Sequence, residues 1–593
     1  QGALEILLCG IEMATMQLKT HRFFTAISPL LFCIVVNGSS LPWGKLNLIV
    51  VTDVHTWVSG QQRQIDGIQK TADYGDLLSF SSHLKNISTL KMADIFLLNN
   101  GDIVDGTGIG YPNGESVTPI IQKIPFDLVN CGNHELYENA TLRNLLTPNS
   151  GLVSHFSENY LTSNTVLTST GKHLGNKYRI LPGRDGLNYV AFGFLYNMKD
   201  SSKQVKVQTV QHTVNQTWFR EALKMGNAAI ILAHMDFKDP LIDVILSRVR
   251  QLQGNEYPVV FLTGHTHIRG SSILDRYAIS IEFGHYLDTI GFVGINFTSP
   301  PTFNFSNIVP SRENLVNITN ISSDRFDTEE GIEIKRIISI TRKAMSLDEV
   351  IGCNPRTLSP NDPFTWNLYL NTVVPVMLHV KDRDNYFSMV SPGAFRYNLF
   401  QGVVTRDDVI SFSPFHEKFY VASGVMGSIL LGIIRNDTFL ASSSHSMNIS
   451  NIKPEKQYNF YFPGFYKDRI EAGLLQFSST VELSAVETPL NTTSVWEKYI
   501  QESWPRSCEE GLSNHGTTHE NTLSFGAIAG ILLAATFVVI LGAYAGWNII
   551  LKQRRKRRDE QNRDPYGTLR LDDQHDISID NLAIELGDPS VVV

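Results

Sequence analysis

Short apolar runs recur through the first half of the chain, and stretches of helical character separate them. The runs include residues 46–51, 95–98, 228–233 and 259–262. Apolar runs of this length are typical of strands that are buried on both faces of a sheet. Their alternation with helices predicts an α/β layered domain over residues 41–326.

A single helix is predicted over residues 327–347. Thr328 can cap its start, Glu329 and Glu330 lie in the first turn, and Arg342 and Lys343 come near its end. This order of charges suits the helix dipole. We expect residues 327–350 to link the first domain to an α+β second domain over residues 351–508, where the patterns are mixed. Residues 509–522 are polar and predict a stalk.

The N-terminal residues have the features of a secretory signal. Lys19 and Arg22 precede an apolar stretch over residues 23–36, and small residues follow at 38–40. This pattern predicts a leader with a signal peptide over residues 1–40. The alternative is a short N-terminal membrane anchor.

A second apolar segment predicts a transmembrane helix over residues 523–550. Its core, Phe525 to Trp547, carries no charge and is long enough to cross a hydrocarbon layer of about 30 Å. Six basic residues follow within residues 552–558 and predict that the tail, 551–593, is cytosolic. A GPI signal is disfavoured, because its apolar tail would end the chain. The two segments together predict a single-pass type I membrane protein with a lumenal or extracellular body.

Composition adds limits to this topology. Hydrophobic residues make up 42% of the 593 residues and the formal charge is only −8, which gives no reason to expect nucleic acid as a partner. Glycosylation is predicted at ten Asn-x-Ser/Thr sequons between the leader and the span: Asn86, Asn139, Asn215, Asn296, Asn304, Asn317, Asn320, Asn436, Asn448 and Asn491.

Three cysteines remain outside the leader, so at most one intramolecular disulfide can form. Cys353 opens the second domain and Cys508 closes it. The hypothesis is that these two pair in an oxidising compartment, and the alternative is two separate thiols.

Five polar motifs follow the apolar runs or mixed strands. They contain Asp53 and His55; Asp102 and Asp105; Asn133, His134 and Glu135; His234; and His265 and His267. Loops at the carboxyl ends of strands converge on one edge of an α/β sheet, so these side chains can build one site. Carboxylate, imidazole and amide oxygen suit Mn, Zn or Fe. One shared Asp can bridge two such ions about 3.5–4 Å apart, an arrangement that serves phosphoryl transfer.

The order of these motifs resembles the calcineurin-like metallophosphoesterase superfamily. Over residues 45–505 the chain resembles its 5′-nucleotidase family. Asn-His-Glu-Leu-Tyr at 133–137 and Gly-His-Thr-His-Ile-Arg at 264–269 are most similar to its fungal membrane or secreted members. The resemblance implies a layered β-sandwich catalytic domain and a smaller C-terminal substrate domain.

The resemblance also implies roles for individual residues. The first metal ion would be held by Asp53, His55, Asp102 and His267. The second would be held by Asp102, Asn133, His234 and His265. Asp102 would bridge the two ions. His134 would be catalytic, stabilising charge on the leaving oxygen while a hydroxide between the metals attacks phosphorus in line.

The chain departs from the family beside His134. The family places an Asp three residues after this His to orient it, and here that residue is Tyr137. A phenol can only hydrogen-bond, whereas a carboxylate also fixes the imidazole tautomer and raises its basicity. Glu135 and Asp105 are the two candidates to take over this task.

The second domain matches the family only in part. Arg396, in Gly-Ala-Phe-Arg at 393–396, would contact the substrate, and Phe415 would stack on the base. The alternative is a packed aromatic ring and a surface Arg. Ser391 replaces the family's Asn, and the motif near its second stacking aromatic is absent, although residues 458–466 are rich in aromatics. We therefore expect a clamp with one aromatic side and broad hydrolysis of phosphomonoesters.

The leading hypothesis is a membrane-anchored metal-dependent phosphohydrolase that acts on nucleotides or related phosphate esters. A cyclic-nucleotide phosphodiesterase or a general phosphatase is the alternative within the enzyme class. The alternative outside it is an inactive metal-binding surface or sorting protein. Tyr566 to Leu569 fits a Tyr-x-x-apolar motif that an adaptor complex binds, which would direct the protein to the vacuole or lysosome and not to the cell surface.

Overall fold

The computed structural model describes residues 41–61, 71–437, 440, 445–477 and 483–508. The predicted leader, stalk, transmembrane helix and cytosolic tail lie outside these residues. Within the described ranges, no helix has the length and apolar character needed to cross a membrane.

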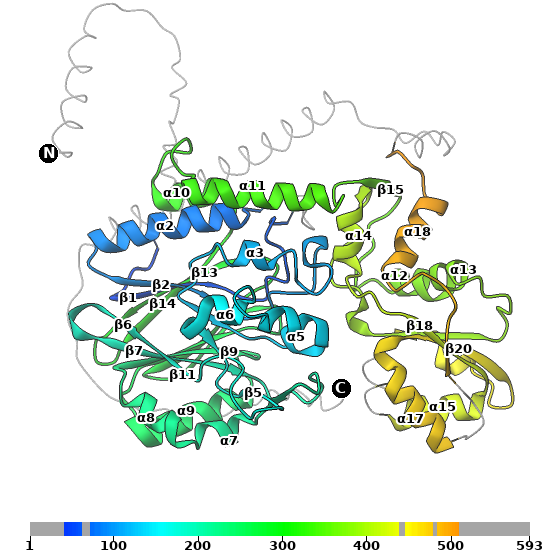
Figure 1. Ribbon diagram of the computed structural model, residues 1–593, viewed down its shortest axis with the longest axis horizontal. Helices are drawn as coiled ribbons and strands as arrows, with labels where there is room; N and C mark the ends of the chain where they lie inside the picture. Colours follow the sequence, from blue (N-terminus) through cyan, green and yellow to red (C-terminus); the bar gives the residue numbers. More distant parts are fainter. Residues whose placement is uncertain (1–40, 62–70, 438–439, 441–444, 478–482, 509–593) are drawn as a thin grey trace, which may run out of the picture. The chain divides into compact units, whose positions relative to one another are not determined.

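The N-terminal part of the chain, residues 41–326, contains two six-stranded sheets (Figure 1). The first has the order β14-β13-β1-β2-β3-β4, and the second has the order β11-β12-β10-β9-β7-β6. The strands of the first are β1 (Leu46–Val51), β2 (Asp94–Asn99), β3 (Leu128–Asn130), β4 (Tyr160–Leu161), β13 (Ile290–Asn296) and β14 (Thr302–Ile308). Those of the second are β6 (Arg179–Pro182), β7 (Asn188–Leu195), β9 (Ala228–His234), β10 (Val259–Thr263), β11 (Arg269–Asp275) and β12 (Ala278–Phe283).

Helices cover the outer faces of both sheets. The longest on the first sheet are α2 (Tyr74–Leu90) and α11 (Glu329–Ala344), and on the second α7 (Val210–Val214), α8 (Thr217–Leu223) and α9 (Pro240–Gln253). Shorter elements are α3 (Thr118–Ile121), α4 (His134–Tyr137), α5 (Asn139–Leu146), α6 (Leu152–Phe156), α10 (Arg312–Thr319) and the strand pair β5 (Thr165–Leu167) and β8 (Val205–Val207).

Strand β1 explains why the predicted strands are apolar on both faces. Ile49 and Val51 belong to the core under α2, whereas Leu46, Leu48 and Val50 belong to the core between the two sheets. A strand with buried neighbours on both sides needs apolar residues at nearly every position. The layered arrangement that the sequence predicts is confirmed.

Helix α11 begins and ends close to its predicted limits, and it packs along α2. The Thr328 side chain accepts a hydrogen bond from the Gly331 amide at 3.1 Å. A Cβ at Gly75 would lie 2.4 Å from the Gly331 carbonyl oxygen, so glycine allows the two helices to approach closely. Lys335 Nζ donates to Asp76 Oδ1 at 2.7 Å. The helix is therefore an integral layer of the N-terminal part and not only a connection.

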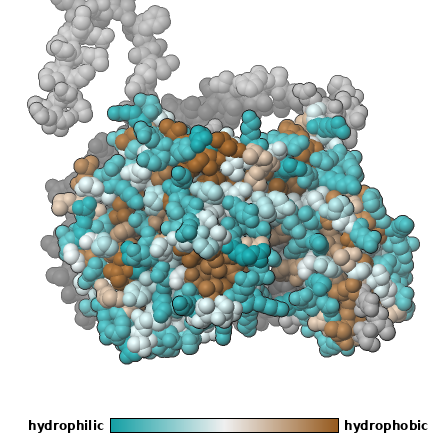
Figure 2. Space-filling view, viewed as in Figure 1, coloured by the Kyte–Doolittle hydropathy of each residue, from teal (hydrophilic) through white to brown (hydrophobic). Residues whose placement is uncertain are grey.

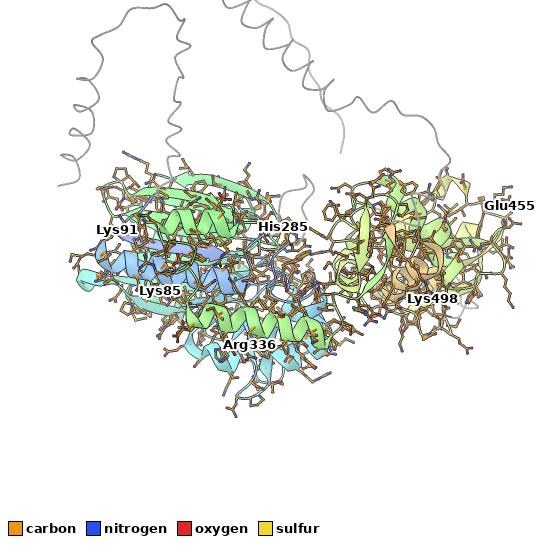
Figure 3. All side chains as sticks on the ribbon, turned by 90° about the horizontal axis from the view of Figure 1, so that it is seen from above. Lys85, Lys91, His285, Arg336, Glu455 and Lys498 are labelled. Atoms are coloured by element: carbon orange, nitrogen blue, oxygen red, sulfur yellow. A yellow bond between two sulfur atoms is a disulfide. The ribbon has the colours of Figure 1, made fainter. Side chains whose placement is uncertain are left out.

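The solvent side of α11 carries both charged and apolar side chains. Arg336 projects on its outer side (Figure 3) and pairs with Glu333 at 2.7 Å. Ile332 and Ile340 are exposed, and apolar surface lies where α11 runs (Figure 2).

The C-terminal part, residues 351–508, combines a five-stranded sheet with helices, and a two-stranded sheet joins it to the residues after α11. The large sheet has the order β19-β16-β20-β18-β21. Its strands are β16 (Tyr386–Val390), β18 (Phe419–Met426), β19 (His445–Ser446), β20 (Gln457–Pro463) and β21 (Leu483–Ala485), and the small sheet pairs β15 (Val350–Asn354) with β17 (Gly402–Thr405). The helices are α12 (Pro363–Leu368), α13 (Val374–Met377), α14 (Arg406–Phe412), α15 (Gly427–Asn436), α17 (Lys467–Phe477) and α18 (Ser494–Ser503).

The ends of the C-terminal part are tied together. Cys353 on β15 and Cys508 beyond α18 form a disulfide with a Cα–Cα distance of 5.2 Å. The Cys353 amide also donates to the Pro505 carbonyl at 2.8 Å. This is the pairing that the sequence predicts, and the third described cysteine, Cys131, is buried and free.

Asp407 on α14 connects the two parts of the chain. Its carboxylate accepts from the Gly108 amide at 2.7 Å and from Arg342 Nη1, near the end of α11, at 2.6 Å. The contact fixes α14 against the N-terminal layers and brings the residues after β16 toward the carboxyl ends of β1 and β2.

Candidate active site

Every predicted metal-ligand residue lies in a loop at the carboxyl end of a strand or at a strand's last residue. Asp53 and His55 follow β1, Asp102 follows β2, and His265 and His267 follow β10. These five residues have φ angles between 45° and 79°, a left-handed region that non-glycine residues seldom adopt. Such conformations cluster at functional sites, where the surrounding structure enforces them.

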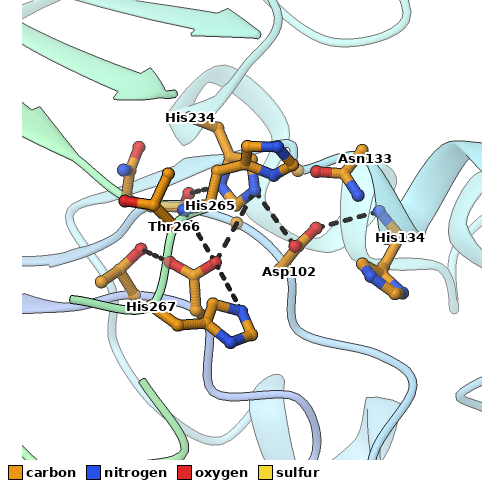
Figure 4. A network of polar contacts seen from close by, with 12 residues as sticks. Asp102, Asn133, His134, His234, His265, Thr266 and His267 are labelled. Atoms are coloured by element: carbon orange, nitrogen blue, oxygen red, sulfur yellow. Dashed lines mark hydrogen bonds and ion pairs between the residues drawn. The ribbon is translucent and has the colours of Figure 1, made fainter. Parts of the chain in front are cut away.

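The structure brings these side chains into two groups that share Asp102 (Figure 4). The first group is Asp53, His55, Asp102 and His267, and the second is Asp102, His234 and His265. Asp102 Oδ2 lies 3.5 Å from His55 Nε2 and 3.1 Å from His234 Nε2. A carboxylate between two imidazole-bearing groups is the geometry that a bridging ligand needs.

Backbone carbonyls orient the imidazoles. His55 Nδ1 lies 2.9 Å from the Val104 carbonyl oxygen, and His234 Nδ1 lies 2.9 Å from that of Asn100. Because a carbonyl can only accept, Nδ1 carries the proton in each ring and Nε2 keeps its lone pair for the centre of the site.

Burial favours the neutral, ligating form of two of the histidines. It lowers the pKa of His265 to about 4 and the pKa of His55 well below its ordinary value. Burial acts in the same direction on His234, but the carboxylates of Asp102 and Asp53 raise its pKa to about 10. Burial would raise the pKa of Asp102, yet His234 and His134 hold it well below its ordinary value. The two buried carboxylates and His234 thus stabilise one another's charged forms, and a divalent cation bound by the carboxylates would take the place of the His234 proton.

Asn133 provides an independent test of whether a metal ion fits. Its Nδ2 donates to the Tyr137 hydroxyl at 3.2 Å. Its Oδ1 is buried and has no hydrogen-bond partner among the described residues. A buried amide oxygen without a donor is costly unless a cation takes the donor's place. The donor set of carboxylate, imidazole and amide oxygen therefore fits hard or borderline divalent ions.

Asp105 is the carboxylate that orients His134. Its Oδ2 lies 3.0 Å from His134 Nδ1, and the His134 amide donates to Asp102 Oδ1 at 2.9 Å. Tyr137 does not take this place, since its hydroxyl holds Asn133, and its ring meets the His134 ring edge-on at 5.4 Å. Of the two candidates that the sequence offers, the structure selects Asp105.

Glu135 instead organises the loop that carries Asp102. Its carboxylate accepts from the amides of Asp102, Ile103 and Gly132 at 2.7–3.0 Å. Burial and the charge of Asp102 raise the pKa of Glu135 to about 7. The Glu135 carboxylate therefore fixes the position of Asp102 and binds backbone amides, not the His134 ring.

A cavity of about 1190 Å³ extends from the metal-ligand groups into the C-terminal part. Asp105, His134 and His265 line one end, and Arg396 and Phe415 line the same cavity. The Phe415 ring lies 6.4 Å from the His134 ring at an interplanar angle of 20°, and the Arg396 guanidinium lies 6.0 Å from the Phe415 ring centre. Arg396 Nε also donates to the Tyr286 hydroxyl at 3.2 Å, so it is not a plain surface residue.

The structure adds an aromatic residue of the C-terminal part to the cavity that Phe415 lines. Phe465, in the turn Gly464–Tyr466 after β20, lines the same cavity and is 50% exposed. Sequence reasoning noticed the aromatic stretch around it but did not single it out. It also missed Glu417, which lines the cavity, and His285, whose ring stacks on His267 at 4.6 Å. The sequence signal for His285 is its place two residues after strand β12.

The chain is similar to known proteins over most of its described length. Residues 46–269 match the model of the calcineurin-like phosphoesterase family. An uncharacterized protein of Schizosaccharomyces pombe is 26% identical over 426 residues, which are 64% of this chain and 70% of that protein. A secreted protein of Arthroderma benhamiae is 26% identical over 450 residues, 66% of each chain. The crystal structure of a 5′-nucleotidase from Candida albicans has a TM-score of 0.69 at 23% identity and covers 78% of this chain and 99% of its own, which shows a shared fold.

Proposed function

Because residues 46–269 match the model of the calcineurin-like phosphoesterase family, we propose that this chain is a two-metal phosphohydrolase of the 5′-nucleotidase type. Its substrates would be nucleotides or related phosphate monoesters. The fold that it shares with a 5′-nucleotidase supports this choice over a cyclic-nucleotide phosphodiesterase.

The observation that carries the proposal is the position of Asp102 between two groups of ligands. The first ion would be bound by Asp53, His55, Asp102 and His267. The second ion would be bound by the second group, Asp102, His234 and His265, together with the Asn133 Oδ1, which has no hydrogen-bond partner among the described residues. Mn, Zn and Fe all fit this mixture of oxygen and nitrogen donors.

When bound, two divalent ions supply an activated water nucleophile and neutralise charge on the phosphoryl oxygens. His134 lines the cavity, and its amide donates to Asp102, so it is placed to act on a phosphate bound there. Asp105 lies at hydrogen-bond distance from His134 Nδ1 and orients the ring, so that Nε2 can act on the leaving oxygen. Arg396 adds a positive charge in the same cavity, where it can bind the phosphate or the leaving group.

The leaving group would lie against aromatic rings in the C-terminal part. Phe415 and Phe465 both line the cavity that contains His134. Base–aromatic stacking contributes about 1–3 kcal/mol per base. The sequence predicts one stacking ring and broad hydrolysis of phosphomonoesters. With two stacking rings, the preference for nucleotides over simple aryl phosphates would be stronger.

Phosphate release tests the proposal. The purified protein would be stripped of metal and assayed on nucleoside monophosphates, a cyclic nucleotide and an aryl phosphate, with and without Mn²⁺ or Zn²⁺. We expect metal-dependent hydrolysis of the monoesters and little of the cyclic diester. Absence of hydrolysis with every metal would favour the inactive metal-binding alternative, and preference for the cyclic diester would favour a phosphodiesterase.

We also propose that the described residues lie in the lumen of the secretory pathway or outside the cell. The disulfide supports an oxidising compartment. Eight of the ten sequon asparagines are exposed, and Asn296 and Asn491 are half-buried. A loss of apparent mass on treatment with a peptide N-glycosidase would support this location, and an unchanged mass would contradict it.

A further inference from the structure

Glu417 is a carboxylate in the wall of the substrate cavity that has no cationic partner among the described residues. It lies two residues after Phe415, and its Oε2 accepts from the Phe465 amide at 2.8 Å. It is thereby connected to Phe415 and Phe465, two of the aromatic residues that line the cavity. No Lys, Arg or His among the described residues lies within ion-pair distance of it, whereas Asp437 in the same wall lies 3.5 Å from Arg469.

The backbone of Glu417 is held in place on both sides. Its amide donates to Thr492 Oγ1 at 3.1 Å, and its carbonyl accepts from the Thr492 amide at 3.1 Å. The carboxylate therefore has a fixed position, as a group that recognises a ligand requires. Its second oxygen, Oε1, has no hydrogen-bond partner in the part of the chain that the structure describes.

We propose that Glu417 selects the leaving group by accepting hydrogen bonds from the edge of its ring, and that the preferred substrates are nucleoside monophosphates with guanine as the base. This inference rests on the proposed function, since it names the substrate class of the same cavity. The ring of such a base would lie against Phe415 and Phe465, and its edge would reach the carboxylate that connects them.

Guanine fits because an ionised carboxylate can only accept. The N1–H and the N2 amino group of guanine are neighbouring donors, so they match the two oxygens of one carboxylate. Adenine and cytosine present an amino group beside a ring nitrogen that accepts, and uracil presents one N–H between two carbonyls. Each of these edges brings a lone pair toward Glu417, which is repulsive.

In the free cavity Glu417 is only partly ionised at neutral pH, and N–H donors from a substrate would favour its ionised, accepting form. Burial, with a smaller contribution from Glu138, raises the pKa of Glu417 to about 7. A buried carboxylate with too few donors shows such a shift, and substrate N–H groups would supply the missing donors.

Binding of guanosine and inosine tests the inference apart from catalysis. These nucleosides lack the phosphate and differ only in the N2 amino group of guanosine. A hydrogen bond to a charged group changes affinity about ten- to a hundredfold, so we expect guanosine to bind tighter by that factor in calorimetry. In Glu417→Gln, the amide oxygen can keep the bond to the Phe465 amide, and a donor NH₂ then replaces the acceptor Oε1. The preference should vanish or reverse.

Glu471→Gln is the matched control, because Glu471 is exposed on α17 and does not line the cavity. It removes the same charge and should leave the ratio of the two affinities unchanged. An unchanged unfolding midpoint would show that Glu417→Gln folds.

Equal binding of the two nucleosides by the native chain overturns the inference, as does a preference that survives Glu417→Gln. Hydrolysis of phosphate esters without a preference for guanosine would leave the proposed function intact and sink only this inference. A preference for guanosine that depends on Glu417, found without hydrolysis of any ester, would support this inference and contradict the proposed function.

Discussion

Replacing Asp105 by asparagine tests how His134 is held during the reaction. The substitution keeps the size of the side chain and leaves the Asp105 carbonyl, which accepts from His55 Nδ1 at 2.9 Å, in place. It removes the charge that lies 3.0 Å from His134 Nδ1. An asparagine can also turn its NH₂ toward the ring, which would favour the wrong tautomer.

The size of the effect follows from the burial of the pair. A hydrogen bond between charged groups contributes about 1.5–3 kcal/mol, which corresponds to roughly ten- to a hundredfold in rate. The His134 side chain is 8% exposed, but that of Asp105 is 29% exposed, so solvent screens part of the interaction. We therefore expect kcat to fall about tenfold to thirtyfold, the lower half of that range. KM should change little, because the charge acts on the transition state.

Steady-state hydrolysis of an aryl phosphate and the metal content of the purified variant would be measured together. Asp105→Asn should retain its metal ions, which separates its effect from that of a lost ligand. Turnover within twofold of the native rate would refute the assignment of Asp105 as the orienting group. A variant that loses metal would show that Asp105 supports the ligands instead.

Three further predictions follow from the site and the fold. Asp102→Asn should lower the metal content and reduce kcat by orders of magnitude without unfolding the chain; a near-normal rate would exclude a shared ligand. Phe415→Ala and Phe465→Ala should each lower kcat/KM for a nucleotide about ten- to a hundredfold and leave aryl phosphates almost unchanged, since stacking contributes about 1–3 kcal/mol; equal losses on both substrates would point to a structural role. Replacing Cys353 and Cys508 by serine should lower the free energy of unfolding by roughly 2–5 kcal/mol in denaturant titrations; an unchanged stability would mean that the bond does not form in solution.

The same pattern of apolar strands predicts both the α/β layers and the metal-ligand residues of the site. Strands buried on both faces have a recognisable pattern, and polar residues directly after them are expected at the carboxyl ends of the strands. Asp53 and Asp102 follow neighbouring strands of the first sheet, but His234 ends β9 in the second sheet, so the prediction that all the motifs meet at one edge of a single sheet is wrong. The motifs predict the ligands, whereas the packing of the two sheets brings them together.

The partners around those side chains could not be predicted, because they depend on how irregular loops are shaped. Asp105 and Glu135 are both carboxylates close to His134 in sequence, yet one reaches the ring and the other caps backbone amides. Phe465 lies in a short turn, where neither a helical nor a strand period marks the side that faces the cavity. A few torsion angles decide which partner each of these side chains contacts, and the hydrophobic pattern of the sequence does not show them.

The left-handed backbone of the ligand loops has a thermodynamic consequence for the whole fold. A residue held in this region costs about 1–3 kcal/mol, so five such residues together oppose folding by about 5–15 kcal/mol. That sum is similar to the entire stability of an ordinary domain. Ions that bind only the folded chain add stability in proportion to the logarithm of their concentration. The melting temperature of this protein should thus report the free metal concentration around it, and a chelator should act on it as a mild denaturant.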